Sequence, residues 1–447
     1  MLKKQIKNYT LLITGLISTI LSIILLIKGK EVIKLMIYLI GSELILINVI
    51  NIILLPFKKK YKLVDNLIKS IVNILFGISI IVFEKYIMAS VTLIFGLYIL
   101  LIAFINSISY IMYIKNNIKG KISVFINSLV SYIFAFILFI NPTLNIKYVL
   151  IILSIYLMLY GIKNIINFII QIIPKRIRNK IKSSIDFPIP IIIAMFIPKA
   201  LLKEINDKLK IDKEPNFDYV KFDSKPKLFV IIHLAKSGSA SYGHMEISYD
   251  GKVYSYGNYN MHSRKLFESM GDGIILIADK DKYINYCTKY KERYLIEFGI
   301  VLTEKEEKQI QKRIQKLITE NTVPYYSDLE LYEMGKLEKR DFNDMSSEIH
   351  KYANGKYLKI TKGKNKLFFV LKNNCAAFAE QILKGSGKRI IKLHGIISPG
   401  TYYEYLNNAF LLKNTNVVSR KIYMEEKNAR ITRSRDSKKF TKKESNK

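Results

Sequence analysis

Long runs of apolar residues dominate the chain up to about residue 173, and a different pattern follows from about residue 225. Six apolar stretches approach the length of about 20 residues that a membrane-spanning helix requires. They occupy residues 9–27, 32–55, 67–83, 86–114, 122–140 and 148–173. From residue 225 onward, short apolar or alternating segments are separated by turn residues, which predicts strands interspersed with helices. We therefore expect a multi-domain protein, with an all-α transmembrane bundle of six helices followed by an α+β domain.

The polar segments of the α+β half predict its elements in more detail. Asp250-Gly251 lies between two alternating segments and is typical of a tight hairpin turn. Thr303, with Glu306 three residues later, is typical of a capped helix start. The predicted strands lie at 227–235, 243–259 (a hairpin), 271–279 and 293–302; helices are expected at 303–321 and 398–406, and a strand–turn–helix unit at 366–383.

Basic residues are unevenly distributed among the loops between the apolar stretches. One set of loops, with the N-terminus, carries 16 Lys or Arg residues, including those at 58–69 and 175–182, whereas the opposite set carries 5. Because positively charged loops stay on the cytoplasmic side, both termini and the α+β domain are expected there. The pattern predicts a multi-pass protein of the cell membrane.

The charge also divides the chain. Residues 1–175 form the predicted transmembrane domain, 176–224 a basic connector, 225–412 the α+β domain and 413–447 a basic tail. In the connector, the apolar segment 187–202 is short and interrupted by prolines, which favours an interfacial position over a seventh span.

The tail composition predicts disorder, since it offers little apolar surface to bury. It carries 12 Lys or Arg against 4 Asp or Glu, out of a net charge of +34 for the chain. Such a tail is attracted to anionic lipid headgroups. No motif that combines aromatic and basic residues accompanies the charge, so nucleic acid is not an expected partner.

The apolar stretches also show a repeat. Gly41, Gly96 and Ser154 occupy matching places in the second, fourth and sixth stretches. Small residues there let helices approach closely in lipid. Three such two-helix hairpins, over about residues 9–173, resemble the HdeD family of acid-resistance membrane proteins, and the resemblance implies a stress-response role.

Cys375 is the residue that most suggests chemistry. It follows Asn374, a good N-cap, and begins a predicted helix. Unpaired backbone N–H groups and the helix dipole at such a position favour a thiolate, and the same N–H groups can hold an oxyanion. The other cysteine, Cys287, is expected to be an unreactive helix residue. Two cysteines and five unpaired histidines exclude a disulfide framework and make a metal site unlikely, and no cofactor is expected.

His244 is the leading partner for Cys375. Strand alternation places His244 and Glu246 on one face, and folding at Asp250-Gly251 brings Ser255 onto the same face. Ser255 is a candidate to orient the imidazole, although a dyad without a third residue is equally consistent with the pattern. His233, inside an apolar strand, is expected in the core, and His350 in a polar surface context.

Three segments carry a second resemblance: "GHMEISYDGKVYSYGNY", then "NNCAAFAEQILKGSG", then "ISPGTYYEYL". Over about residues 225–410 they resemble the circularly permuted papain-like fold, in which His precedes Cys, as in PPPDE-type isopeptidases and relatives of NlpC-type peptidases. The resemblance implies that Cys375 is the nucleophile and His244 the general base. The acyltransferase-like branch of this group has a second His where this chain has Ser255. The long separation of His244 from Cys375 implies an insertion around residues 280–365.

Together these patterns predict a membrane-anchored Cys/His hydrolase of the thiol protease, amidase or acyltransferase type. Its substrate would be an amide, isopeptide or ester bond in a peptide, a protein tail or an acyl lipid. An alternative is a membrane stress-response protein whose soluble domain binds a ligand or partner without catalysis. A cell-wall amidase is a further alternative, which requires the domain to lie outside the cell.

Overall fold

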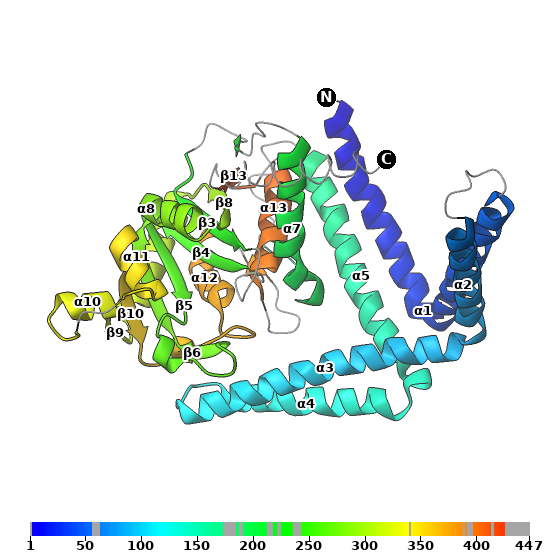
Figure 1. Cartoon of the computed structure of the whole chain (residues 1–447), viewed down its shortest axis with the longest axis horizontal. Coiled ribbons are helices and arrows are strands. Elements are labelled where there is room, and N and C mark those ends of the chain that lie inside the picture. Colours follow the sequence, from blue (N-terminus) through cyan, green and yellow to red (C-terminus); the bar gives the residue numbers. More distant parts are fainter. Residues whose placement is uncertain are drawn as a thin grey trace. The chain divides into compact units, whose positions relative to one another are not determined.

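The computed structural model describes most of the chain. The described residues are 2–55, 63–172, 185–186, 191–211, 218–220, 225–235, 243–338, 341–387, 389–390, 397–412 and 415–424. They form two compact units, Met1–Tyr110 with Ile122–Ile172 and Ile111–Lys121 with Ile173–Lys447. The first unit is helical and the second is built around a sheet (Figure 1).

The helices of the N-terminal region are α1 (Leu2–Ile53), α2 (Leu63–Val82), α3 (Glu84–Lys115), α4 (Lys121–Ile140) and α5 (Pro142–Ile172). Each contains a stretch long and apolar enough to cross a membrane. The multi-domain prediction and the membrane class are therefore confirmed at this level.

Six spans were expected, and the difference from five helices lies in α1. The first two apolar stretches continue into one element of 52 residues, in which Lys28 has a non-helical backbone (φ −126°, ψ 31°). A straight helix of that length would measure about 78 Å, far more than the hydrocarbon core of about 30 Å. The two parts of α1 on either side of Lys28 correspond to the first two predicted spans. The basic loop segments 58–62 and 175–182 lie outside the described residues.

Two pairs of glycines bring helix backbones into contact. A Cβ atom added to Gly41 would lie 3.0 Å from the carbonyl oxygen of Gly77, and one added to Gly77 would lie 2.9 Å from that of Gly41. Gly15 and Gly161 are related in the same way, at 3.0 and 2.8 Å. These contacts join the second part of α1 to α2 and the first part to α5, so the closest packing does not follow the consecutive hairpins expected from the sequence.

Replacing Gly161 by Leu is expected to destabilise the helical unit by about 1–3 kcal/mol, the usual result of overpacking. A Cβ atom there would overlap Thr19 Oγ1 and lie 2.8 Å from the Gly15 carbonyl oxygen, so α1 and α5 must separate. Thermal unfolding of the full chain in detergent measures the effect. The control is Ile162→Leu, at a half-exposed neighbour, and equal melting temperatures for the two variants would contradict the prediction.

The C-terminal domain contains a nine-stranded sheet in which all neighbouring strands are antiparallel. Its spatial order is β2 (Tyr219–Val220), β13 (Val417–Tyr423), β8 (Tyr294–Ile300), β3 (Leu228–Leu234), β4 (His244–Tyr249), β5 (Lys252–Gly257), β7 (Ile274–Asp279), β10 (Lys356–Ile360) and β9 (Thr322–Tyr325). Two short pairs lie outside this sheet: β1 (Ile185–Asp186) with β12 (Arg389–Ile390), and β6 (Met270–Asp272) with β11 (Leu367–Phe369).

Helices cover both faces of the sheet (Figure 1). One face packs against α7 (Ile191–Ile211), α9 (Glu304–Thr319), α12 (Cys375–Leu383) and α13 (Pro399–Leu411). The other packs against α8 (Lys280–Asn285), the turn at Tyr286–Tyr290 and α11 (Met345–Ala353). Consecutive side chains of β3, such as Ile231 and Ile232, pack in the two different cores. Both faces of this strand are therefore apolar in sequence.

Most of the predicted local elements are confirmed. Asp250 and Gly251 both have positive φ, 50° and 68°, as a type I′ turn requires. Thr303 and Glu306 form the predicted capping box at the start of α9. Ser398 caps α13, and Asn374 caps α12 through a hydrogen bond from the Ala377 N–H.

Three expectations need correction. Val417–Tyr423, assigned to a disordered tail from residue 413, instead form β13 inside the sheet, because Val417 and Val418 are buried. Arg420 and Lys421, which follow the two valines, made this segment resemble the rest of the basic tail in composition. The rest of the tail, 425–447, lies outside the described residues.

The other two corrections concern the connector and the expected insertion. In the connector, where an interfacial segment was expected, α7 buries Leu202 and Ile205 in the domain core. The region 280–365, expected as an insertion, contributes β8 and β10 to the interior of the sheet.

Candidate functional site

Cys375 is the first residue of α12, and its position depends on Asn374. The Asn374 side chain accepts the Ala377 N–H and donates to the backbone oxygens of Val370 and Ile397. The turn before the helix is thereby tied to two other segments. Cys375 itself is 5% exposed, so its thiol is held in a defined place at the positive end of the helix.

His244 is the first residue of β4, and its imidazole lies beside the Cys375 thiol, close enough to interact by a hydrogen bond and by charge. Its Nε2 atom lies 2.8 Å from Ser255 Oγ and 3.4 Å from Glu246 Oε1. These two contacts orient the imidazole ring through Nε2. The pair predicted from the sequence, Cys375 and His244, is brought together in the structure.

Glu246 is the residue that the sequence reasoning placed on the correct face but did not assign. Its side chain is fully buried. One carboxylate oxygen accepts a hydrogen bond from Tyr283 Oη at 2.6 Å and lies near His244, and the other lies 2.9 Å from His233 Nε2. A buried carboxylate is costly unless such partners surround it, so an acid two residues after a histidine in an otherwise apolar strand was the available signal.

His233 completes the surroundings of Glu246. Its Nδ1 atom lies 3.5 Å from an Arg293 guanidinium nitrogen, which has only protons to donate. Nδ1 is therefore the acceptor, and Nε2 carries the proton that His233 donates to Glu246. His233 is buried, as expected, but its role is to hold a carboxylate as well as to fill the core.

Ser255 lies where the sequence predicted, on the His244 face of the hairpin. Its hydroxyl oxygen accepts a hydrogen bond from Tyr259 Oη at 2.7 Å and lies within reach of His244. A neutral hydroxyl orients a ring but does little to stabilise its positive charge. The Glu246 carboxylate carries the negative charge that stabilises a positively charged ring. The geometry therefore favours Glu246 as the third member of a triad and Ser255 as a positioning residue.

The electrostatics agree with this assignment. Burial alone would lower the pKa of His244, but Cys375 and Glu246 outweigh burial and raise it to about 10. Burial likewise opposes ionisation of Glu246, yet contacts with His233 and His244 hold its pKa well below the usual range. Burial lowers the pKa of His233. At neutral pH the site therefore contains a protonated His244 between an ionised Glu246 and Cys375.

The first turn of α12 also offers an oxyanion site. Asn374 already accepts the N–H groups of Ala377, through its side chain, and of Phe378, through its backbone oxygen. Within the described parts of the chain, the N–H groups of Cys375 and Ala376 remain as donors for a substrate oxygen next to the nucleophile.

The flanks of the site are defined in part. A Cβ atom on Gly243, just before His244, would lie 3.1 Å from both Pro198 and Pro399, so α7 and α13 adjoin this end of β4. Residues 236–242, which include most of the small-residue segment before His244, and residues 391–396 lie outside the described residues.

Cys287 lies in a different environment from Cys375. It is fully buried in the turn at Tyr286–Tyr290, and burial raises its pKa to about 12. The expectation of an unreactive thiol is in accord with this environment. Within the described parts of the chain, no cluster of three or more His, Cys, Asp or Glu side chains has the arrangement of a metal site.

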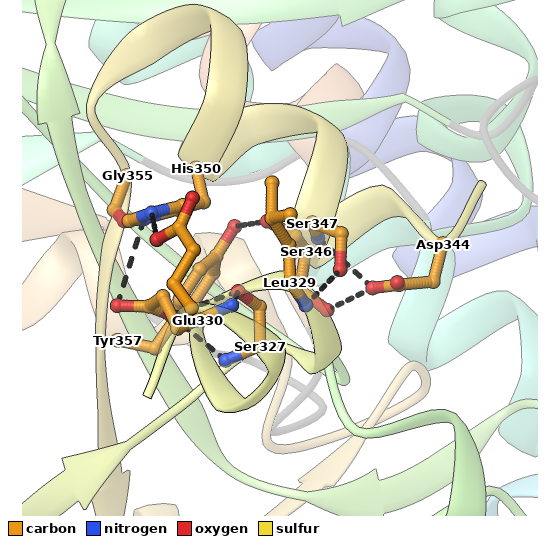
Figure 2. Close-up of polar contacts among 10 residues, drawn as sticks. Ser327, Leu329, Glu330, Asp344, Ser346, Ser347, His350, Gly355 and Tyr357 are labelled. Atoms are coloured by element: carbon orange, nitrogen blue, oxygen red, sulfur yellow. Dashed lines mark hydrogen bonds and ion pairs between the residues drawn. The ribbon is translucent and has the colours of Figure 1, made fainter. Parts of the chain in front are cut away.

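A second polar cluster, around His350, has a structural role (Figure 2). His350 Nδ1 lies 3.0 Å from the Gly355 carbonyl oxygen, and Nε2 lies 3.2 Å from Glu333. Asp344 and Ser327 cap α11 and α10 (Asp328–Glu333), and Figure 2 shows how the Ser347 hydroxyl accepts the Leu329 N–H between these helices. The cluster contains no thiol, and it joins α10, α11 and β10.

Comparison of the chain with family models, with curated proteins and with solved structures produced no match. The class of the molecule therefore follows from its own features: a membrane protein with a mixed helix–sheet domain that holds a cysteine, a histidine and a buried glutamate together.

Proposed function

We propose that this protein is a membrane-anchored thiol hydrolase that cleaves, or transfers an acyl group from, an amide, isopeptide or ester bond. The observation that carries the proposal is the contact of Cys375, at the start of α12, with a His244 ring held by the buried Glu246. Glu246 and Ser255 both lie near His244 Nε2 and orient the ring, as the base of an activated nucleophile requires.

In the proposed reaction the Cys375 thiolate attacks the acyl carbon, and the N–H groups of Cys375 and Ala376 stabilise the oxyanion. His244 then donates its proton to the leaving amine or alcohol, and a thioester forms as the old bond breaks. Deprotonation of a water molecule by His244 allows hydroxide to attack the thioester, which releases the acid and returns the proton to the Cys375–His244 pair. Glu246 keeps the imidazole in one orientation and stabilises its charged form.

Three expectations from the sequence complete the proposal. The order of His before Cys, with Asn before Cys, supports a permuted papain-like domain, and the matching places of Gly41, Gly96 and Ser154 in the sequence support an HdeD-like membrane region. The distribution of basic loops supports a cytoplasmic position for the domain and both termini. A substrate near the membrane, such as a peptide, a protein tail or an acyl lipid, agrees with this arrangement.

The test is alkylation of Cys375 by iodoacetamide, followed by mass spectrometry of the full chain in detergent. An ordinary thiol, with a pKa of about 8.5, loses reactivity about tenfold for each pH unit below that value. Cys375 is expected to be the cysteine that iodoacetamide modifies at both pH 8 and pH 6, because His244 and the start of α12 adjoin its thiol. Cys287 should stay unmodified.

The control compares His244→Ala with His262→Ala, which removes an exposed histidine outside the site. His244→Ala should slow alkylation at pH 6 by at least about tenfold, and His262→Ala should leave the rate unchanged. A protected thiol, or one that responds equally to both variants, would instead support a soluble domain that binds a ligand or partner without catalysis.

A further inference from the structure

A cleft of about 430 Å³ lies in the C-terminal domain, away from Cys375. It is bordered by the C-terminal half of α9, the turn after β10 and the C-terminal end of α12. Cys375 and Leu383 are the first and last residues of α12, so the cleft and the thiol lie at opposite ends of a helix about 12 Å long. The cleft is therefore a separate feature of the domain.

The charges that line the cleft are almost all positive. Five cationic side chains face one carboxylate, that of Glu320. The cations are Arg313, Lys316, Lys362, Lys364 and Lys384. Lys316 lies 3.5 Å from Glu320, and Lys384 lies 3.8 Å from Glu380, so these two are partly neutralised. The residues that line the cleft carry a net charge of +4, from five positive groups and one negative group.

The fold supports this arrangement with fixed groups. Arg313 donates from its guanidinium to the backbone oxygen of Gln381 at 3.0 Å, which ties α9 to α12 and orients the arginine. Asn365 and Gln381 bond to each other through their side-chain amides at 3.3 Å. The cations thus converge from three chain segments onto a wall that also offers amide groups.

Like charges gathered in one cleft repel each other, and a bound anion relieves that repulsion. Arginine and lysine together are the usual partners of phosphate, because guanidinium binds two oxygens and lysine adds point charges. We propose that the cleft binds a phosphate-bearing anion with at least two negative charges. A lipid headgroup and a soluble diphosphate share that chemistry, and the experiment separates them.

Binding is measured as protection of individual lysines from acetylation by an N-hydroxysuccinimide ester, read by mass spectrometry. The full chain is held in nanodiscs of phosphatidylcholine and titrated with inorganic pyrophosphate in one arm; in the other, the nanodiscs contain phosphatidic acid. Acetylation of Lys362 and Lys364 is expected to slow by at least about fivefold, because only the small fraction of protein without a bound anion then reacts. Acetylation of Lys305 and Lys308 should change little. Protection by pyrophosphate alone identifies a soluble ligand, and protection by phosphatidic acid alone identifies a headgroup.

The matched variants remove equal charge inside and outside the cleft. Lys362→Gln with Lys364→Gln should weaken protection of Lys316 and Lys384 about tenfold or more, since hydrogen bonds to charged groups are strong. Lys305→Gln with Lys308→Gln removes two lysines that are exposed on α9. This double variant should weaken the protection of Lys316 and Lys384 by less than about twofold, because salt screens the attraction between exposed lysines and the anion. Absence of protection in both arms, or equal weakening by the two double variants, overturns the proposal. Because protection is read without turnover, its failure is distinct from failure of the proposed hydrolase.

Discussion

Replacing Glu246 by Gln is expected to slow the hydrolysis of p-nitrophenyl acetate by about 10²- to 10⁴-fold, the range that general acid–base catalysis contributes. The carboxylate is the buried charge that stabilises the protonated His244 ring, and glutamine keeps the shape but loses the charge. Ser255→Ala should cost less than about tenfold, since it removes one neutral hydrogen bond. Steady-state release of p-nitrophenol by the full chain in detergent measures both.

The ranking of the two variants decides which residue is the third member. Cys375→Ala supplies the background rate, and hydrogen exchange of β4 verifies that each variant retains its fold. A loss in Ser255→Ala equal to or greater than that in Glu246→Gln would assign the role to Ser255. An undiminished rate in Cys375→Ala would show that the ester is cleaved elsewhere.

Replacing Glu246 by Ala should lower the free energy of unfolding of the domain by about 3–5 kcal/mol, the usual result of removing one partner from a buried charged pair. His233 and Tyr283 lose their acceptor in a core that water does not reach, and the partly exposed His244 loses the same carboxylate. Hydrogen exchange of β4 peptides, measured by mass spectrometry, reports the free energy of opening.

The Glu246 carboxylate and the His244 ring also make the stability of the domain depend on pH. The pKa of Glu246 in the folded protein lies well below the ordinary 4.5, so its contribution is complete above pH 4.5 and is lost as the pH falls. The pKa of His244 is raised from 6.5 to about 10, so its contribution is complete below pH 6.5 and is lost as the pH rises toward 10. Burial lowers the pKa of His233 below 6.5, so the contribution of this ring is lost as the pH falls below 6.5. The protection of β4 should therefore be greatest near pH 6.5 and should fall on both sides.

The control for this measurement is Glu204→Ala, which removes an exposed ion pair with Lys208 on α7. It should change the free energy of opening by less than about 1 kcal/mol, as surface pairs do. Equal effects of the two variants would show that the buried carboxylate is not held by its partners as described.

The parts of the fold that could be predicted are those in which local signals agree. The Asp250-Gly251 turn has one favoured geometry, and it appears. The Thr303 capping box fixes the start of α9 in the same way. The failures occur where composition hides a pattern. Val417–Tyr423 bury two valines beside arginine and lysine, and only pairing with β8 across the sheet identifies them as a strand.

In the candidate site, too, the features with local sequence signals could be predicted and those that depend on distant segments could not. A cysteine after an Asn cap and a histidine at a strand start are local features, and their meeting could be expected from the order of the motifs. The role of Glu246 could not be derived with certainty, because it depends on His233 of β3 and Tyr283 of α8, which approach only in the folded domain. The cleft around Arg313 and Lys362 depends equally on segments distant in sequence.

The place of β13 has a consequence for how the chain is made. β8 ends at Ile300, but its neighbour β13 begins at Val417. A ribosome that adds about 5–20 residues per second needs roughly ten seconds to cover that interval. Throughout this time the apolar β8, which carries Ile296, Phe298 and Ile300, has an unpaired edge open to other nascent chains. The domain therefore completes its sheet late in translation, after the membrane helices have left the ribosome.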